Sequence, residues 1–131
     1  MLGQTQAFSG FSVDDLDRAR GFYGETLGLD VEESGQGEMR MLTLKLGSGA
    51  LVFVYPKPNH TPATFTILNF PVDDIDEAVS RLEARGVALE RYAGFEHDDK
   101  GVVRGAGGDG PAAIAWFTDP AGNVLSLIQE N

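Results

Sequence analysis

The chain has 131 residues, of which 42% are hydrophobic and 23% charged, the composition of an ordinary globular domain, and it contains no cysteine, which excludes disulfides and thiolate chemistry. A formal net charge of −10 without a basic patch argues against nucleic acid as a partner. The N-terminus lacks the features of a secretory signal and no apolar run approaches the ~20 residues of a membrane span, which predicts a cytoplasmic protein without a membrane partner.

The first half of the sequence predicts one strand, one helix and three further strands. The strand covers residues 6–13, and the carboxylate of Asp15 can cap the helix that follows. Apolar residues recur in that helix at helical spacing until Gly28, which permits the left-handed conformation that ends a helix. The three further strands are expected at 29–33, 39–46 and 50–55, separated by glycine-containing turns.

A polar, proline-containing linker at 57–63 separates this half from a second one of the same order. A strand at 64–72 precedes a helix that begins at Asp74, has Glu77 three residues later as in a capping box, and closes at Gly86. Three further strands are expected at 89–92, 112–118 and 124–129, the last two joined by a tight turn at 119–122, and residues 101–104 are an additional strand candidate.

The two halves also share a sequence repeat. F-S-V-D-D-L-D at 11–17 and F-P-V-D-D-I-D at 70–76 are offset by 70 − 11 = 59 residues, and each follows a strand and opens a helix. The repeat predicts a single α+β domain of two tandem βαβββ modules, at about 6–56 and about 64–131. A ligand site is expected between them.

Three stretches carry a resemblance to a known family. They are V-D-D-L-D-R-A-R-G-F-Y-G-E-T-L-G-L at 13–29, V-D-D-I-D at 72–76 and F-T-D-P-A-G-N-V-L-S-L-I at 117–128. The sequence resembles the glyoxalase / bleomycin-resistance / extradiol dioxygenase (vicinal oxygen chelate) superfamily. The resemblance implies a cupped, mostly antiparallel eight-stranded sheet with the helices outside, and a homodimer.

The resemblance also implies where a divalent metal ion would be bound. The metalloenzymes of the family use four side chains, at positions that correspond here to Phe8, Val52 or Val54, Ile67 and Ser126. None of these side chains can chelate such an ion. A one-residue shift of register does not supply better ligands. The expected cofactor is therefore none, and no metal ligand is predicted.

Apolar residues at these positions predict a pocket for an organic molecule. Strand alternation predicts that the pocket is lined by Phe8, Ser12, Val52, Val54, Ile67, Asn69 and Ser126. Asn69 and Ser126 are the expected polar anchors. Tyr55, Tyr92 and Phe95 are interpreted as lining the mouth of the pocket.

Three further positions have a functional interpretation and a structural alternative. Trp116 could stack on a ligand or be a core aromatic. Arg104 could bind an anionic group or be a surface charge. His97, between Glu96 and Asp98, is the candidate for proton transfer or a new metal site, with a solvated acidic loop as the alternative. No catalytic residue is otherwise indicated.

Two remaining features are interpreted as non-functional. His60 lies in the proline-containing linker and is expected in solvent. Residues 105–110 match the glycine pattern G-x-G-x-x-G, but Pro111 and a strand follow instead of a helix, which predicts a plain loop.

These observations favour a metal-independent protein that binds a small molecule and sequesters an aromatic or cationic ligand. The alternative is a glyoxalase-like, metal-dependent lyase, epimerase or dioxygenase, so whether the protein is an enzyme stays open. A regulatory or partner-binding module is a third possibility.

Overall fold

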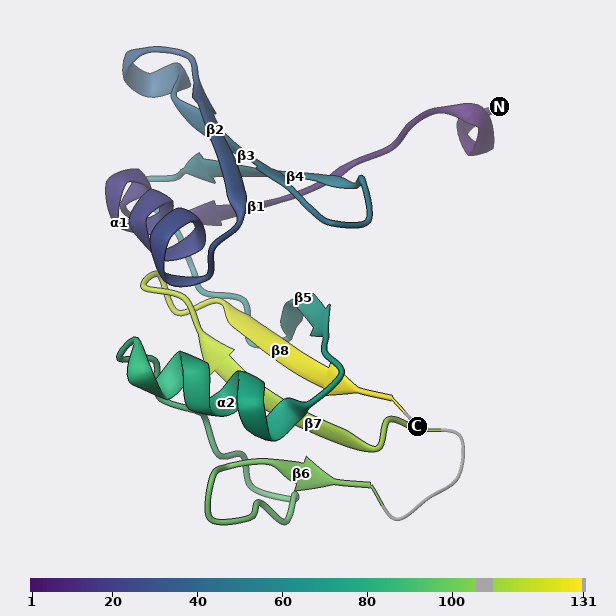
Figure 1. Ribbon diagram of the computed structural model, residues 1–131. Helices are drawn as coiled ribbons and strands as arrows, with labels where there is room; N and C mark the ends of the chain where they lie inside the picture. The colour runs from purple at the N-terminus through teal and green to yellow at the C-terminus, as the bar shows by residue number, and fades with distance from the viewer. Residues whose placement is uncertain (106–109, 131) are drawn as a thin grey trace. The chain divides into compact units, whose positions relative to one another are not determined.

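The computed structural model describes residues 1–105 and 110–130, so most of the predicted glycine loop lies outside the described residues. The chain divides into two compact units, Met1–Pro62 and Ala63–Asn131, with the boundary inside the predicted linker. Each unit contains a four-stranded sheet and an α-helix (Figure 1). Within the described ranges, no helix is long and apolar enough to cross a membrane.

The first unit has the predicted order of strand, helix and three strands. Its elements are β1 (Ser9–Val13), α1 (Leu16–Gly21), the π-helical turn η2 (Phe22–Thr26), β2 (Asp30–Ser34), β3 (Met41–Lys45) and β4 (Leu51–Pro56), with short 3-10 turns at Leu2–Gln4 and Gly37–Met39. The strands lie in the order β1-β4-β3-β2. β1 runs parallel to β4, and the other two pairs are antiparallel.

Local signals explain where the first helix begins and ends. The Asp15 carboxylate accepts a hydrogen bond from the backbone N–H of Arg18 at 3.1 Å, as a capping residue does. After the π-helical turn, Gly28 has a φ of 76°, the conformation that ends a helix. The helix packs on β3 and β4. The fully buried side chains of this core are Val13, Tyr23, Leu42, Leu44 and Val54.

The second unit repeats this arrangement. Its elements are β5 (Thr66–Pro71), α2 (Ile75–Ala84), β6 (Val103–Arg104), β7 (Ala113–Thr118) and β8 (Val124–Gln129). The strands lie in the order β5-β8-β7-β6, with β5 parallel to β8 and the rest antiparallel. α2 packs on β7 and β8. Its core includes Ile75, Val79, Ala115, Phe117 and Leu125.

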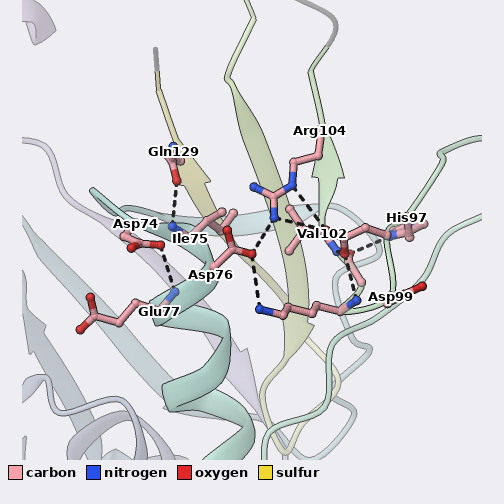
Figure 2. Close-up of polar contacts among 12 residues, drawn as sticks. Asp74, Ile75, Asp76, Glu77, His97, Asp99, Val102, Arg104 and Gln129 are labelled. Carbon is pink, nitrogen blue, oxygen red and sulfur yellow. Dashed lines mark hydrogen bonds and ion pairs between the residues drawn. The ribbon is translucent and has the colours of Figure 1, made fainter.

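The second helix is fixed at its N-terminus by two side chains (Figure 2). The Asp74 carboxylate accepts from the backbone N–H of Glu77 at 3.1 Å, and Gln129 at the end of β8 accepts from the N–H of Ile75 at 2.8 Å. These bonds satisfy two of the N–H groups that a helix leaves without partners at its start. They attach the helix to the sheet beneath it.

The predicted α+β fold of eight strands and two helices is confirmed. The strands form two four-stranded sheets, one in each unit, and most strand pairs are antiparallel. One predicted strand is missing from the part of the chain that the structure describes. The strand predicted at 89–92 is absent from the described residues, where only Glu90 forms an isolated bridge, to Trp116. Residues in this stretch instead follow a loop held by its own side chains, described below.

Candidate functional site

Each sheet has one face covered by its helix and one opposite face, which we call the helix-free face. In β1, Phe11 and Val13 lie on the helix side, where the Phe11 ring is 5.7 Å from that of Tyr23. Alternation places Ser12 on the helix-free face. Phe8, just before β1, stacks on Phe53 of β4 with ring centroids 4.4 Å apart. The predicted position of Phe11 and Val13 on the helix side is therefore confirmed.

The predicted face of β4 is wrong. The register pairs Phe11 with Val54 and Ser9 with Val52, so both valines lie on the helix side. There they are part of the core under α1, with exposed fractions of 0% and 7%. The β4 residues on the helix-free face are Leu51, Phe53 and Tyr55. Since all five residues 51–55 are apolar or aromatic, hydrophobicity alone did not distinguish the two faces.

Ser12 has a partner that sequence reasoning missed. Its hydroxyl lies 2.7 Å from Nδ1 of His60, which is half-buried instead of solvated. The linker returns to the sheet because the N–H of Lys57 donates to the Val13 carbonyl, and the N–H of His60 donates to the Lys57 carbonyl. The two residues are 48 positions apart, so no local pattern signals the pair. Together they form a polar pair on the first sheet.

Three of the predicted ligand residues lie in one row on the helix-free face of the second sheet. The register pairs Ser126 of β8 with Asn69 of β5 on one side and with Trp116 of β7 on the other. Ser126 is fully buried, and its hydroxyl donates to Oδ1 of Asn69 at 2.5 Å. The Trp116 indole N–H donates to the Thr66 hydroxyl at 3.2 Å.

Ile67 does not belong to this row. The pairing of β5 with β8 shifts between Thr66 and Leu68, and Ile67 is the residue without a register partner. Such a bulge breaks the alternation of faces on which its prediction rested.

Aromatic rings from the loop between α2 and β6 gather around Trp116. The centroid of the Trp116 ring lies 5.5 Å from that of Tyr92 at 74°, and 5.1 Å from that of Phe95 at 53°. The ring of His97 lies 6.2 Å away at 63°. Phe95 is 53% exposed, and Trp116 and Tyr92 are half-buried. We call Trp116, Tyr92 and Phe95 the aromatic corner.

Glu90 lies beside the aromatic corner. Its N–H donates to the Trp116 carbonyl at 2.7 Å, and its carboxylate accepts from the Thr118 hydroxyl at 3.4 Å. Burial raises the pKa of the Tyr92 hydroxyl above its ordinary value, and the negative charge of Glu90 raises it further. The Glu90 carboxylate therefore acts electrostatically on at least one side chain of the aromatic corner, Tyr92.

His97, the candidate for proton transfer, is hydrogen-bonded to its own loop through both ring nitrogens. Nδ1 lies 2.8 Å from the carbonyl of Gly101, and Nε2 accepts from the N–H of Tyr92 at 3.0 Å. Nε2 also lies 3.3 Å from the Tyr92 carbonyl, so both ring nitrogens contact backbone groups of the loop. The imidazole thus holds the loop in shape and positions Tyr92 against Trp116.

Arg104, predicted as an anchor for an anionic ligand, lies on the other face. It pairs with Ala113, which faces α2, and its guanidinium donates to Asp76 on the helix at 2.6 Å and to Asp98 at 3.2 Å (Figure 2). The hydrogen bond from Arg104 to Asp76 is the main cause that raises the pKa of the guanidinium. Arg104 therefore ties the loop to the helix and is not brought together with Trp116.

The Asp98 carboxylate is a second fixed point of the loop. Burial raises the pKa of Asp98, but hydrogen bonds from the N–H groups of Val102 and Lys100, together with Arg104, outweigh burial and hold the pKa below its ordinary value. Because the folded-state pKa is the lower one, the carboxylate stabilises the fold above about pH 4, and this contribution is lost as the pH falls through the folded-state pKa.

We therefore expect Asp98→Asn to have a lower free energy of unfolding at pH 7 than the unsubstituted protein. Between about pH 4 and pH 2, we expect the free energy of unfolding of the variant to fall less than that of the unsubstituted protein. Urea unfolding over this pH range measures both effects. Asp99→Asn, at the exposed neighbouring position, is the control. An unchanged pH dependence in Asp98→Asn would contradict the assigned role.

The residues do not fit the metal site that the resemblance implies. Phe8 and Ile67 offer no donor atoms, and the Ser126 hydroxyl is buried against Asn69. On β4, the residue between the two valines that lies on the helix-free face is Phe53, which also has no donor atom for a metal ion. Over residues 1–105 and 110–130, no group of three or more His, Cys, Asp or Glu side chains is placed to hold a metal ion.

Comparison with known proteins gives one family. The model of the Glyoxalase/Bleomycin resistance protein/Dioxygenase superfamily matches residues 5–127. Among solved structures, the chain is similar to TnmS3, an antibiotic binding protein from Streptomyces sp. CB03234, with 27% identity, 98% of each chain covered and a TM-score of 0.68.

Two further structures extend the comparison. A superfamily member from Sphaerobacter thermophilus has 26% identity and a TM-score of 0.67, with 95% of this chain and 96% of that chain covered. The fosfomycin resistance protein FosX from Listeria monocytogenes, at 16% identity, shares the fold with a TM-score of 0.69, and the match covers 95% of this chain and 92% of that one. No curated protein matches the sequence.

Proposed function

The chain belongs to the Glyoxalase/Bleomycin resistance protein/Dioxygenase superfamily, and we propose that it binds and sequesters a small aromatic or cationic molecule without a metal ion. The observation that carries the proposal is the nature of the residues at the implied metal positions. They are apolar, or in the case of Ser126 buried and bonded to Asn69. The similarity to TnmS3, described as an antibiotic binding protein, supports the same conclusion.

The helix-free faces have the chemistry for such a ligand. The first sheet presents the stacked rings of Phe8 and Phe53 and the polar pair of Ser12 and His60. The second presents Trp116 and the pair of Asn69 and Ser126. Flat aromatic groups stack on rings of this kind, and a few polar groups orient them. We further propose that the protein is a cytoplasmic homodimer.

Metal content tests the proposal directly. We expect purified, untagged protein to contain no stoichiometric metal by elemental analysis, and its Tm to stay unchanged with micromolar Ni, Zn, Mn, Fe(II) or Co. Stoichiometric metal, or stabilisation by one of these ions, would support the metal-dependent lyase, epimerase or dioxygenase instead.

Light scattering tests the dimer, for which the expected mass is twice the 14.0 kDa of the chain.

A further inference from the structure

We infer that the aromatic corner and Glu90 form a binding site for an organic ammonium group. The inference rests on the proposed function, since it specifies which class of small molecule the second unit takes. It assigns a role to Glu90, Tyr92 and Phe95.

The arrangement of the rings suits a cation. Tyr92 meets Trp116 at 74° and Phe95 meets it at 53°, with ring centroids 5.5 Å and 5.1 Å from that of the indole, so three aromatic rings lie within reach of one small group. A cation within about 6 Å of a ring centroid is attracted by the negative face of the ring, and tryptophan attracts it most strongly. The corner is partly exposed, so a ligand can reach it.

Glu90 supplies a carboxylate on the face of the second sheet that carries Trp116. Glu90 pairs with Trp116, and Thr118, which contacts the carboxylate, lies two residues from Trp116 on the same strand face. Tyr92 is two residues from Glu90. The carboxylate can therefore act on the same ammonium group as the rings.

The lysine and arginine side chains of the loop have partners outside the aromatic corner. Residues 88–104 contain Arg91, Lys100 and Arg104 as their lysine and arginine residues. Arg91 donates to the carbonyl of Asp99, while Lys100 and Arg104 pair with Asp76 on α2. The net charge of −10 adds a long-range attraction for cationic ligands.

The test uses the fluorescence of Trp116, which is the only tryptophan of the chain. The intact protein is titrated with choline and with 3,3-dimethyl-1-butanol, in which an uncharged carbon replaces the nitrogen. We expect the Kd of choline to be about tenfold lower, which corresponds to about 1.4 kcal/mol. Equal affinity for the two probes would overturn the inference.

Variants assign the difference to the corner. Glu90→Gln keeps the shape and the acceptor oxygen but removes the charge, and should weaken choline binding and its dependence on ionic strength. Glu83→Gln removes the same charge from an exposed position of α2 and should leave choline binding unchanged. If the two variants behave alike, the role of Glu90 is refuted.

A third probe, uncharged 1,4-naphthoquinone, separates this inference from the proposed function. Saturable binding of the quinone with no response to choline would overturn the ammonium site and leave small-molecule binding in place. No saturable response to any of the three probes would overturn the ammonium site and also count against a ligand role for Trp116.

Discussion

Replacing Asn123 by alanine should lower the free energy of unfolding by about 3 kcal/mol, because the side chain is buried within a hydrogen-bond network of the β7–β8 turn. Its Nδ2 donates to Oδ2 of Asp119 at 3.1 Å, and its Oδ1 accepts from the N–H of Ala63 at 3.1 Å. The exposed fractions of Asp119 and Asn123 are 4% and 2%. The substitution removes a donor from a buried carboxylate and an acceptor from a backbone N–H.

The same network explains the D-P-A-G-N sequence of this turn. Oδ1 of Asp119 accepts from the N–H groups of Ala121 and Asn123, each at 2.9 Å. These bonds fix the turn. The Asn123 side chain then connects the turn to Ala63, at the start of the second unit. Urea unfolding measures the change in the free energy of unfolding. In thermal unfolding, we expect Tm to fall by roughly 10 °C.

Asn59→Ala is the matched control, since Asn59 is exposed and its side chain accepts a hydrogen bond from the exposed Lys57. We expect it to change the free energy of unfolding by less than about 0.5 kcal/mol. Equal losses in the two variants would show that the buried network does not stabilise the turn.

Local signals predicted most of the secondary structure. Asp15 and Asp74 cap the two helices as expected, and Gly28 and Gly86 both have positive φ values after them. Alternation also predicted that Asn69 and Ser126 share a face, and the register of β5 with β8 pairs these two residues.

The errors arise where the sequence has no local signal. In β4 both faces are apolar, so the side on which the valines lie depends on pairing with β1. The loop after α2 is shaped by hydrogen bonds that the side chains of His97 and Asp98 accept from backbone N–H groups. Hydrophobic periodicity carries no information about such bonds. The contact of Ser12 with His60 depends on the path of the linker.

Replacing Ser126 by glutamate should destabilise the protein by about 3 kcal/mol or more at pH 7, because it introduces a charge at a fully buried position. This is the position at which the resemblance implies a glutamate that binds the metal. Burial raises the pKa of the introduced carboxyl, so the charge-dependent part of the penalty is absent below the ordinary value of about 4.3 and grows as the pH rises. The larger side chain and the lost hydrogen bond to Asn69 add a part that does not depend on pH. Urea unfolding at pH 4 and pH 7, relative to the unsubstituted protein, measures the difference.

Ser80→Glu, the same change at an exposed position of α2, is the control and should cost less than about 0.5 kcal/mol. The informative step is the addition of Ni or Zn to Ser126→Glu. In a metalloenzyme of this family the restored carboxylate would join three other ligands, and the metal would offset the buried charge. Here Phe8, Phe53 and Ile67 supply no donors, so we expect neither ion to restore Tm. Recovery at micromolar metal would refute the conclusion that this site cannot hold a metal ion, because it would require ligands other than Phe8, Phe53 and Ile67.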